Sequence, residues 1–335
     1  MISGKINNTM ETVTPIFLFS LPRSGSTLLQ RMIATHPDVA TESETWLLLP
    51  LFYLARTECS SSEYGARLAT IGIEEIFEKL EDGESEYRKE VATLTQRIYA
   101  KLARNKEKYF LEKTPRYHLI ANEIIEAFPE AKFIFLWRNP LAIVSSMIGT
   151  WGEENRWDLY RYYIDLYKGI ENLINTYENH KSLAIDLQYE DLVQDPDGQL
   201  KRIMEYLDLS STKLQWEDFS RINLSGTWGD RTGAKKYKQV SKEPLEKWKS
   251  QLNNPVRRIW CRRYLNWIGG PRLKTMGYDI ELLQRELSKT GGVSWSMVSD
   301  AARMIYGLIF RILDMPMLRT RLSMLRNRKR IYPFS

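Results

Sequence analysis

The sequence has few cysteines and few histidines. Cys59 and Cys261 are the only two cysteines among 335 residues, and there are three histidines. Two cysteines so far apart have no metal-ligand spacing and form no disulfide framework. This usage is typical of proteins from reducing compartments, so we expect a cytoplasmic protein.

Long apolar runs are also missing. Residues 1–14 are polar and have no apolar core, so we expect no secretory signal peptide. The longest apolar stretches, such as residues 46–55, reach about half the length that a membrane span requires. The hydrophobic content of 43% and the charged content of 27% are ordinary for a globular protein.

Positive charge is concentrated at one end of the chain. The net charge is +6, but residues 301–335 alone carry +7 and residues 1–300 carry −1. A body without net charge argues against a nucleic-acid partner. The partner that charge indicates is local to the C-terminal region.

Short apolar runs alternate with helical patterns along the body of the chain. Residues 16–19 form one run, which ends at the turn residues 22–25. Further strands are expected at 109–111, 133–137 and 183–185, with helical patterns at 119–128, 141–148 and 200–207. This alternation predicts βαβ units and an α/β fold with a central parallel sheet. Ligands of such sheets bind at the carboxyl ends of the strands.

The loop after the first predicted strand is suited to an anion. LPRSGSTLLQ at 21–30 opens a helix whose first N–H groups have no partner within the helix. Gly25 permits close approach of the backbone, while Arg23, Ser26 and Thr27 add a charge and two hydroxyl donors. A capped helix without a ligand is the alternative interpretation.

A P-loop nucleotide triphosphatase is the nearest competitor. Its motif G-x-x-x-x-G-K-[ST] requires Gly and Lys where this chain has Ser20 and Ser26. Asp186 is a candidate for a Walker-type carboxylate, but nothing else supports a Mg²⁺ site. A kinase or NTPase that uses ATP and Mg²⁺ stays an alternative function.

Two more strand ends carry cations. Arg138 follows the strand at 133–137, with Ser146 on the next helix, and Lys113 follows the strand at 109–111. An arginine fork with a serine hydroxyl suits a phosphate monoester. Three cations from three strand ends converge on one crevice, which favours an anionic ligand over isolated ion pairs.

These motifs resemble those of the PAPS-dependent sulfotransferases, whose donor is 3′-phosphoadenosine 5′-phosphosulfate. LPRSGSTLLQ resembles their 5′-phosphosulfate loop, and WRNPLAIVSSM at 137–147 resembles their 3′-phosphate motif. ATHPDVATESET at 34–45 and EKTP at 112–115 are similar to the tyrosylprotein and carbohydrate branches, and residues 187–209 match a further family segment. The resemblance covers about residues 15–270. It implies a P-loop-like three-layer fold and the use of PAPS without a metal.

The resemblance also implies roles for individual residues. The implied donor ligands are Arg23, Ser24, Gly25, Ser26 and Thr27 for the 5′-phosphosulfate, Arg138 and Ser146 for the 3′-phosphate, and Tyr237 and Lys242 from the segment KKYKQVSKEPLEKW. Glu44 is the implied general base. Lys113 and Arg23 are the implied catalytic cations.

The residues alone do not decide which side chain is the general base. The small-molecule branch of the family uses a histidine, and His36 and His118 both lie near motifs. Glu42 is a second glutamate in the same loop as Glu44, and only the resemblance favours Glu44. A histidine therefore stays an alternative base.

An aromatic stretch follows the donor motif. Residues 149–167 contain Trp151, Trp157, Tyr160, Tyr162, Tyr163 and Tyr167. Aromatic rings interleaved with charges suit a sugar or an aromatic acceptor. A helix that buries its aromatic face is the alternative for half of them.

The C-terminal region predicts an amphipathic helix followed by a basic cluster. Apolar residues keep a helical period over 297–313, and LRTRLSMLRNRKRIYPFS follows at 318–335. This pattern resembles a peripheral anchor on an anionic membrane surface. A helix packed on the domain explains it equally well. A membrane-proximal site would favour a glycolipid or lipid-linked sugar acceptor.

The sequence thus predicts a sulfotransferase domain at 15–290, between a flexible N-terminus at 1–14 and a basic, helical C-terminal extension at 291–335. We expect transfer of a sulfuryl group from PAPS to a hydroxyl of a glycan or glycolipid. The alternatives are the kinase or NTPase, and a catalytically inactive scaffold that binds membranes or anions.

Overall fold

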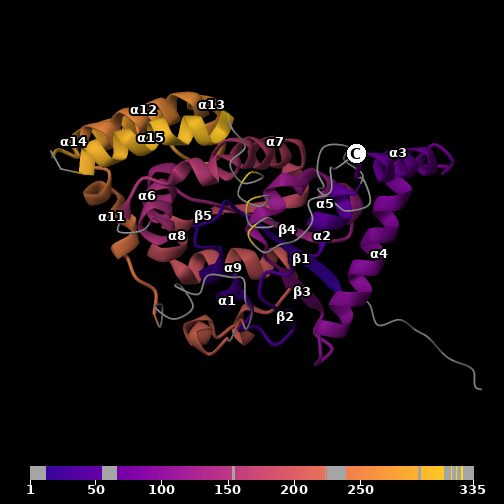
Figure 1. Ribbon diagram of the computed structural model, residues 1–335. Helices are drawn as coiled ribbons and strands as arrows, with labels where there is room; N and C mark the ends of the chain where they lie inside the picture. Colours follow the sequence, from indigo (N-terminus) through magenta and orange to yellow (C-terminus); the bar gives the residue numbers. More distant parts are fainter. Residues whose placement is uncertain are drawn as a thin grey trace, which may run out of the picture.

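A five-stranded sheet lies at the centre of the molecule, with helices on both sides (Figure 1). The computed structural model describes residues 13–54, 66–152, 155–222, 224, 239–292, 296–312, 318, 322 and 326.

All strand pairs of the sheet are parallel, in the order β2-β3-β1-β4-β5. The strands are β1 (Thr14–Phe19), β2 (Val39–Thr41), β3 (Tyr109–Glu112), β4 (Lys132–Trp137) and β5 (Ala184–Gln188). The central strand β1 pairs Phe17 with Glu112 of β3 and Phe19 with Phe135 of β4. The predicted parallel sheet is confirmed. The short strand β2 was missed because three residues do not make a periodic pattern.

Helices cover both faces of the sheet because the strands are apolar on both sides. Ile16 and Leu18 of β1 point to one face and Phe17 and Phe19 to the other, as pleating requires. The core on the side of Ile16 and Leu18 includes residues of α1 (Ser26–Ile33), α8 (Tyr189–Gln194), α9 (Pro196–Tyr206) and the 3-10 helix η7 (Trp216–Arg221). The core on the side of Phe17 and Phe19 includes residues of α4 (Glu84–Leu102), α5 (Ala121–Ala127), α6 (Pro140–Trp151) and α7 (Ile170–Asn179). The result is the predicted three-layer α/β fold.

Shorter elements connect these layers, and a group of helices follows them. The connecting elements are α2 (Leu48–Tyr53), α3 (Ala66–Phe77), the 3-10 helices η1 (Pro115–Leu119), η3 (Leu159–Tyr162), η5 (Lys181–Leu183) and η6 (Ser211–Lys213), and the π-helix η4 (Ile164–Gly169). The C-terminal helices are α11 (Glu243–Gln251), α12 (Pro255–Ile268), α13 (Gly270–Thr275), α14 (Ile280–Lys289) and α15 (Ser296–Ile312). Figure 1 shows α12 to α15 as an outer layer beyond α6 and α7.

The helix α15 docks on the domain through polar contacts. Its buried Asp300 accepts hydrogen bonds from Arg257 Nε and from Asn254 Nδ2, both at 2.7 Å. Arg303 forms an ion pair with Asp158 at 2.5 Å. In the part of the chain that the structure describes, no helix is both long enough and apolar enough to cross a membrane.

Most rings of the aromatic stretch at 149–167 pack against this helical layer. Four rings of the stretch contact rings of α12 or α15, in pairs that include Trp157–Trp260, Tyr160–Tyr306, Tyr163–Trp260 and Tyr167–Tyr264. The other two predicted rings, Trp151 and Tyr162, are tilted against each other with 4.3 Å between centroids. Both are partly buried and pack against the hydrophobic core, so each of the six rings has packing contacts within the protein.

Candidate functional site

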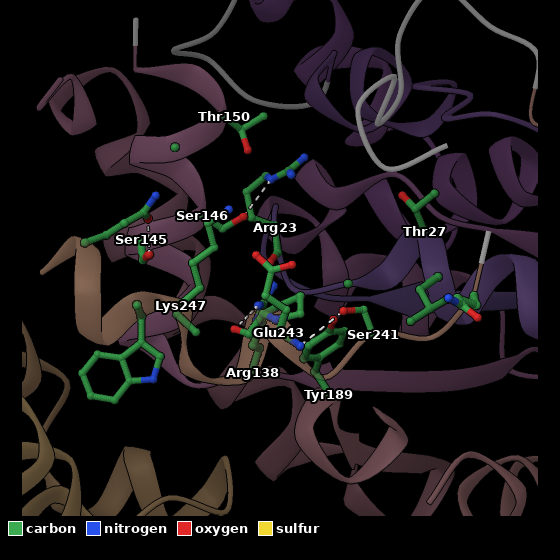
Figure 2. Close-up of a pocket in the computed structure, with 18 of the residues that line it drawn as sticks. Arg23, Thr27, Arg138, Ser145, Ser146, Thr150, Tyr189, Ser241, Glu243 and Lys247 are labelled. Carbon is green, nitrogen blue, oxygen red and sulfur yellow. Dashed lines mark hydrogen bonds between the residues drawn. The ribbon is translucent and has the colours of Figure 1, made fainter. Parts of the chain in front are cut away.

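One cavity of about 580 Å³ lies at the carboxyl ends of three strands. Arg23 follows β1, Arg138 follows β4 and Tyr189 follows β5, and all three side chains line it (Figure 2). Residues of α6 and α11 complete the wall. A cavity of this size, lined by converging polar groups, is typical of a small-molecule site.

The loop after β1 has the backbone geometry of an anion cradle. Gly25 has φ +90° and is the N-cap of α1. A Cβ atom at this position would lie 2.3 Å from Cδ2 of Tyr189, so only glycine fits here. Arg23 also has a positive φ, 69°. The loop thus brings the first N–H groups of α1 and the Arg23 side chain to the same cavity.

The serines and threonine of this loop are placed differently from one another. Thr27 lines the cavity together with Gly25. Ser24 and Ser26 are buried at 1% and 5% exposure and are not among the lining residues. The hydroxyl of Ser24 has no hydrogen-bond partner among the described residues.

Arg138 is a buried cation held in place by neutral groups. It is 7% exposed, and its Nη1 and Nη2 donate to the carbonyl oxygens of Arg23 (2.8 Å) and Pro244 (3.3 Å). Its guanidinium lies 4.3 Å from the ring centre of Tyr189. Its Nε has no hydrogen-bond partner, and no carboxylate of the described residues forms an ion pair with it. A buried charge without a counter-ion is costly, so the cavity is suited to an anion that reaches Arg138.

The two predicted phosphate motifs meet across this cavity. Arg23 Nε donates to Ser146 Oγ at 3.3 Å, although the two residues are 123 positions apart. The neighbouring Ser145 donates a hydrogen bond to Gln251, which ties α6 to α11. The Arg23 guanidinium also lies 5.9 Å from the ring centre of Trp151.

The predicted base and the second cation lie together, but outside the lining of this cavity. Lys113 follows β3 and donates from Nζ to Oε1 of Glu44 at 2.9 Å. The side chains of both residues are largely buried, at 3% and 12% exposure. In the sheet order β3 lies on one side of β1 and β4 on the other. The Arg23 loop therefore stands between the Glu44–Lys113 pair and Arg138.

A buried network at the end of β3 holds the loop that carries Glu44. Glu112 accepts hydrogen bonds from Thr114 Oγ1 at 2.7 Å and from the Tyr99 hydroxyl at 3.1 Å. Thr114 Oγ1 in turn accepts from the backbone N–H of Trp46 at 3.4 Å. Burial raises the pKa of Glu112 to about 7, against the opposing effect of its hydrogen bonds. Trp46 has φ +57°, an unfavourable conformation for a bulky residue that the surrounding contacts must maintain.

Neither histidine near the motifs lines the cavity. His118 is fully buried, and its Nε2 lies 2.8 Å from Oδ1 of Asp165. His36 is 1% exposed, and its Nδ1 accepts from the backbone N–H of Asp38 at 3.1 Å. Burial lowers the pKa of His36. Both rings are held by local contacts, whereas Glu44 lies beside the second cation.

The sequence analysis missed several lining residues. Tyr189 directly follows β5. The rule that ligands bind at the carboxyl ends of strands could therefore have identified it, as it identified Arg138. Lys247 and Trp248 of α11 line the cavity, and Figure 2 shows Lys247 reaching into it. Of the two residues predicted from the same segment, Lys242 is exposed and is not among the lining residues, and Tyr237 lies outside the described residues. Among the described residues of this segment, the lysine that lines the cavity is Lys247.

The carboxylate considered for a metal site has a structural partner. Asp186 lies within β5 rather than after it, and its Oδ1 accepts from the Tyr177 hydroxyl at 2.7 Å. Across the described ranges, no group of three or more His, Cys, Asp or Glu side chains has an arrangement that holds a metal ion.

Comparisons with known proteins place the chain in a family. It is 26% identical over 299 residues to nodulation protein NoeE of Sinorhizobium fredii. The alignment covers 79% of this chain and 66% of that protein. It is also 27% identical over 275 residues to a protein-tyrosine sulfotransferase of Drosophila melanogaster. That alignment covers 79% of this chain and 51% of the relative. The chain thus spans between about half and two thirds of the length of these two relatives.

A solved structure agrees with the fold. The sulfotransferase domain of the olefin synthase from Synechococcus PCC 7002 aligns with a TM-score of 0.50 at 25% identity, over 71% of this chain and 88% of that domain. The profile of the sulfotransferase family matches residues 15–213, which include the loop after β1, Glu44, Lys113 and the Arg138 motif. Because this match covers more than half of the chain, the protein belongs to the sulfotransferase family.

Proposed function

We propose that this protein transfers a sulfuryl group from PAPS to a hydroxyl group of an acceptor. The observation that carries the proposal is Arg138, a buried cation that lines the cavity and has no carboxylate partner among the described residues. It faces a cavity that the anion-binding loop at Gly25 also lines. PAPS is the donor of the family and carries anionic groups at both the 5′ and the 3′ position.

The cavity has residues for both ends of this donor. The loop N–H groups, Arg23 and Thr27 are suited to the 5′-phosphosulfate, because a helix N-terminus and a cation stabilise negative charge. Arg138 and Ser146 are suited to the 3′-phosphate, with Lys247 as a further cation. The ring of Tyr189 lies beneath Arg138 and closes the wall between the two groups.

The pair of Glu44 and Lys113 is suited to the chemistry. As the acceptor oxygen bonds to sulfur, the bond between sulfur and the phosphate oxygen breaks, and PAP leaves with the electron pair. The acceptor hydroxyl must lose its proton in this step, and the Glu44 carboxylate is the group that we assign to accept it. Lys113 is at hydrogen-bond distance from Glu44 and is the cation that we assign to the transferring group.

A glycan or glycolipid hydroxyl is the acceptor class that we favour. The ring of Trp151, which is tilted against that of Tyr162, lies 5.9 Å from the Arg23 guanidinium. Such rings bind the apolar face of a sugar. A protein tyrosine is the second candidate, because the relative from Drosophila is named a protein-tyrosine sulfotransferase.

Calorimetric titration with PAP tests the donor assignment. Arg138→Ala should weaken PAP binding by roughly 30-fold to several thousand-fold, since loss of one partner of a buried charged contact costs about 2–5 kcal/mol. Arg272→Ala is the control, because this arginine forms a half-exposed ion pair with Glu171. Unchanged affinity in Arg138→Ala, or equally tight binding of a nucleotide without the 3′-phosphate, would contradict the assignment.

Acceptor profiling with labelled PAPS separates the remaining alternatives. Labelled product with glycans or glycolipids supports the favoured class, and product with tyrosine peptides supports the second candidate. ATP binding and Mg²⁺-dependent turnover would support the kinase. Donor binding without turnover on any hydroxyl acceptor would support the inactive scaffold.

A further inference from the structure

The outward face of α15 is apolar along its whole length. Val298, Ile305, Leu308 and Ile309 are 67%, 61%, 61% and 46% exposed. These four residues, here called the outer stripe, lie on one side of the helix at 100° per residue, together with the exposed Ala302. No charged residue of α15 that the structure describes lies on this side.

The two charged residues of α15 whose side chains the structure describes face the domain instead. Asp300 is 1% exposed and is bonded to Arg257, and Arg303 is paired with Asp158. This is the reverse of a typical surface helix, which buries its apolar side and exposes its charges. The ion pairs orient the helix on the domain, so the exposure of the outer stripe is a consequence of specific contacts.

Basic residues are exposed on a neighbouring helix and are frequent in the C-terminal sequence. Arg262 and Arg263 are exposed on α12, the helix that α15 packs against. Residues 319–330 of the sequence carry six Arg or Lys and no acidic residue. Leu318 and Leu322, four positions apart, are 45% and 54% exposed. Apolar exposure and positive charge thus occur together in the C-terminal region.

We propose that the outer stripe docks this protein on an anionic membrane surface. A contiguous exposed apolar patch marks an interaction site, and a helix with such a face binds the boundary between headgroups and acyl chains. Anionic lipids add a favourable electrostatic contribution for each nearby Lys or Arg. The positive charge of this region is the reason to assign a lipid surface rather than a second copy of the chain, since two such basic regions repel each other.

Docking would bring the acceptor side of the site to the membrane. α15 contacts η3, and η3 carries Tyr162 of the ring pair beside Arg23. This orientation suits the glycolipid acceptor of the proposed function, but docking is measured without turnover, so the two proposals fail independently.

Vesicle co-sedimentation of the full chain tests the docking. The wild type should pellet with vesicles of phosphatidylcholine and phosphatidylglycerol, and high salt should reduce the pelleted fraction. The double variant Ile305→Glu/Ile309→Glu should lower the partition coefficient by about tenfold or more, because it places two charges in the apolar contact. PAP affinity should stay unchanged, which shows that the variant is folded.

The control is Ile76→Glu/Leu94→Glu, which changes two residues of similar exposure (55% and 47%) on α3 and α4. These helices lie at the other end of the molecule in Figure 1. The control should pellet like the wild type. Equal pelleting of the stripe variant, or no preference for anionic over neutral vesicles, overturns the proposal. A dimer that light scattering detects and the stripe variant abolishes, without vesicle binding, would assign the stripe to a second copy instead.

Discussion

Arg138 and Glu112 are both buried ionisable residues at strand ends, but their surroundings differ. Arg138 is held by two carbonyl oxygens and a ring, and its side chain lines a cavity. Glu112 is enclosed by the hydroxyls of Thr114 and Tyr99, and burial raises its pKa to about 7. The first environment suits an anionic ligand, and the second stabilises the neutral form of a structural carboxyl group.

At the scale of one residue, Glu44→Gln tests the base. The variant keeps the shape of the side chain and removes the proton acceptor, so kcat should fall by about 10²–10⁴-fold while PAP affinity stays unchanged. Glu42→Gln, two positions earlier in the same loop, should retain its turnover. If Glu44→Gln keeps most of its activity and His118→Ala does not, the base is the histidine.

Gly25→Ala tests the loop geometry. The new Cβ would clash with the Tyr189 ring, and φ +90° is strained for alanine. Strain of about 1–3 kcal/mol at this position should weaken PAP binding by roughly tenfold to a hundredfold in calorimetry. Gly72→Ala on α3 is the matched control, because a Cβ there meets nothing within 4 Å. Wild-type PAP affinity in Gly25→Ala would contradict the assigned loop geometry.

At the scale of elements, the end of β3 and the loop at 42–48 act as one unit. Tyr117 on η1 contributes, since its hydroxyl accepts from the N–H of Leu48 at 3.1 Å and lies 3.2 Å from Thr45 Oγ1. Together with the bond from Trp46 to Thr114, these contacts position the backbone that directly follows Glu44. The Glu44–Lys113 pair is therefore placed by buried neutral contacts rather than by exposed charges.

Glu112 should make the stability of this unit depend on pH. Its pKa is about 7 in the folded protein against 4.5 ordinarily, so between these values the folded state keeps a proton that the unfolded chain loses. Stability should therefore fall as pH rises from 4.5 to 7 and level off above, by about 3 kcal/mol in total. Urea denaturation at several pH values gives the free energies of unfolding of the wild type and of Glu112→Gln. As the pH rises from 4.5 to 7, the variant should become more stable relative to the wild type by about 3 kcal/mol. Glu90→Gln, at an exposed position of α4, should show no such change. A constant difference for Glu112→Gln would show that Glu112 does not titrate in this range.

At the scale of the whole molecule, the strand order separates two tasks. The residues that we assign to the donor follow β1, β4 and β5, whereas Glu44 and Lys113 follow β2 and β3. Arg23 follows the central strand between them. We therefore expect the sulfuryl group to be transferred at Arg23, with the donor nucleotide on one side and the acceptor on the other.

This distribution of cations predicts that turnover is independent of divalent metals. Arg23, Lys113 and the loop N–H groups supply the positive charge that Mg²⁺ supplies in an ATP-using enzyme. Sulfuryl transfer from labelled PAPS should proceed at the same rate in EDTA as in Mg²⁺. Activity that EDTA abolishes and Mg²⁺ restores would favour the kinase or NTPase alternative instead.

Much of the fold and part of the site were predictable because their signals are local in the chain. The strands at 16–19 and 133–137 have apolar runs, and Arg23 and Arg138 follow them directly. The sequence did not single out Lys247 as a lining residue, since a sequence does not show which side of α11 faces the cavity. The aromatic stretch at 149–167 was ambiguous for the same reason, because its packing partners lie about 100 residues later.

The sequence by itself determined the parallel α/β architecture, the anion-binding loop and the resemblance to the sulfotransferases, since each depends on neighbouring residues. Only the tertiary structure decided that Arg23 meets Ser146, that Glu44 pairs with Lys113 and that α15 turns its charges inward. These contacts depend on strand order and helix orientation. Both result from the packing of the whole chain and have no signature in any one segment.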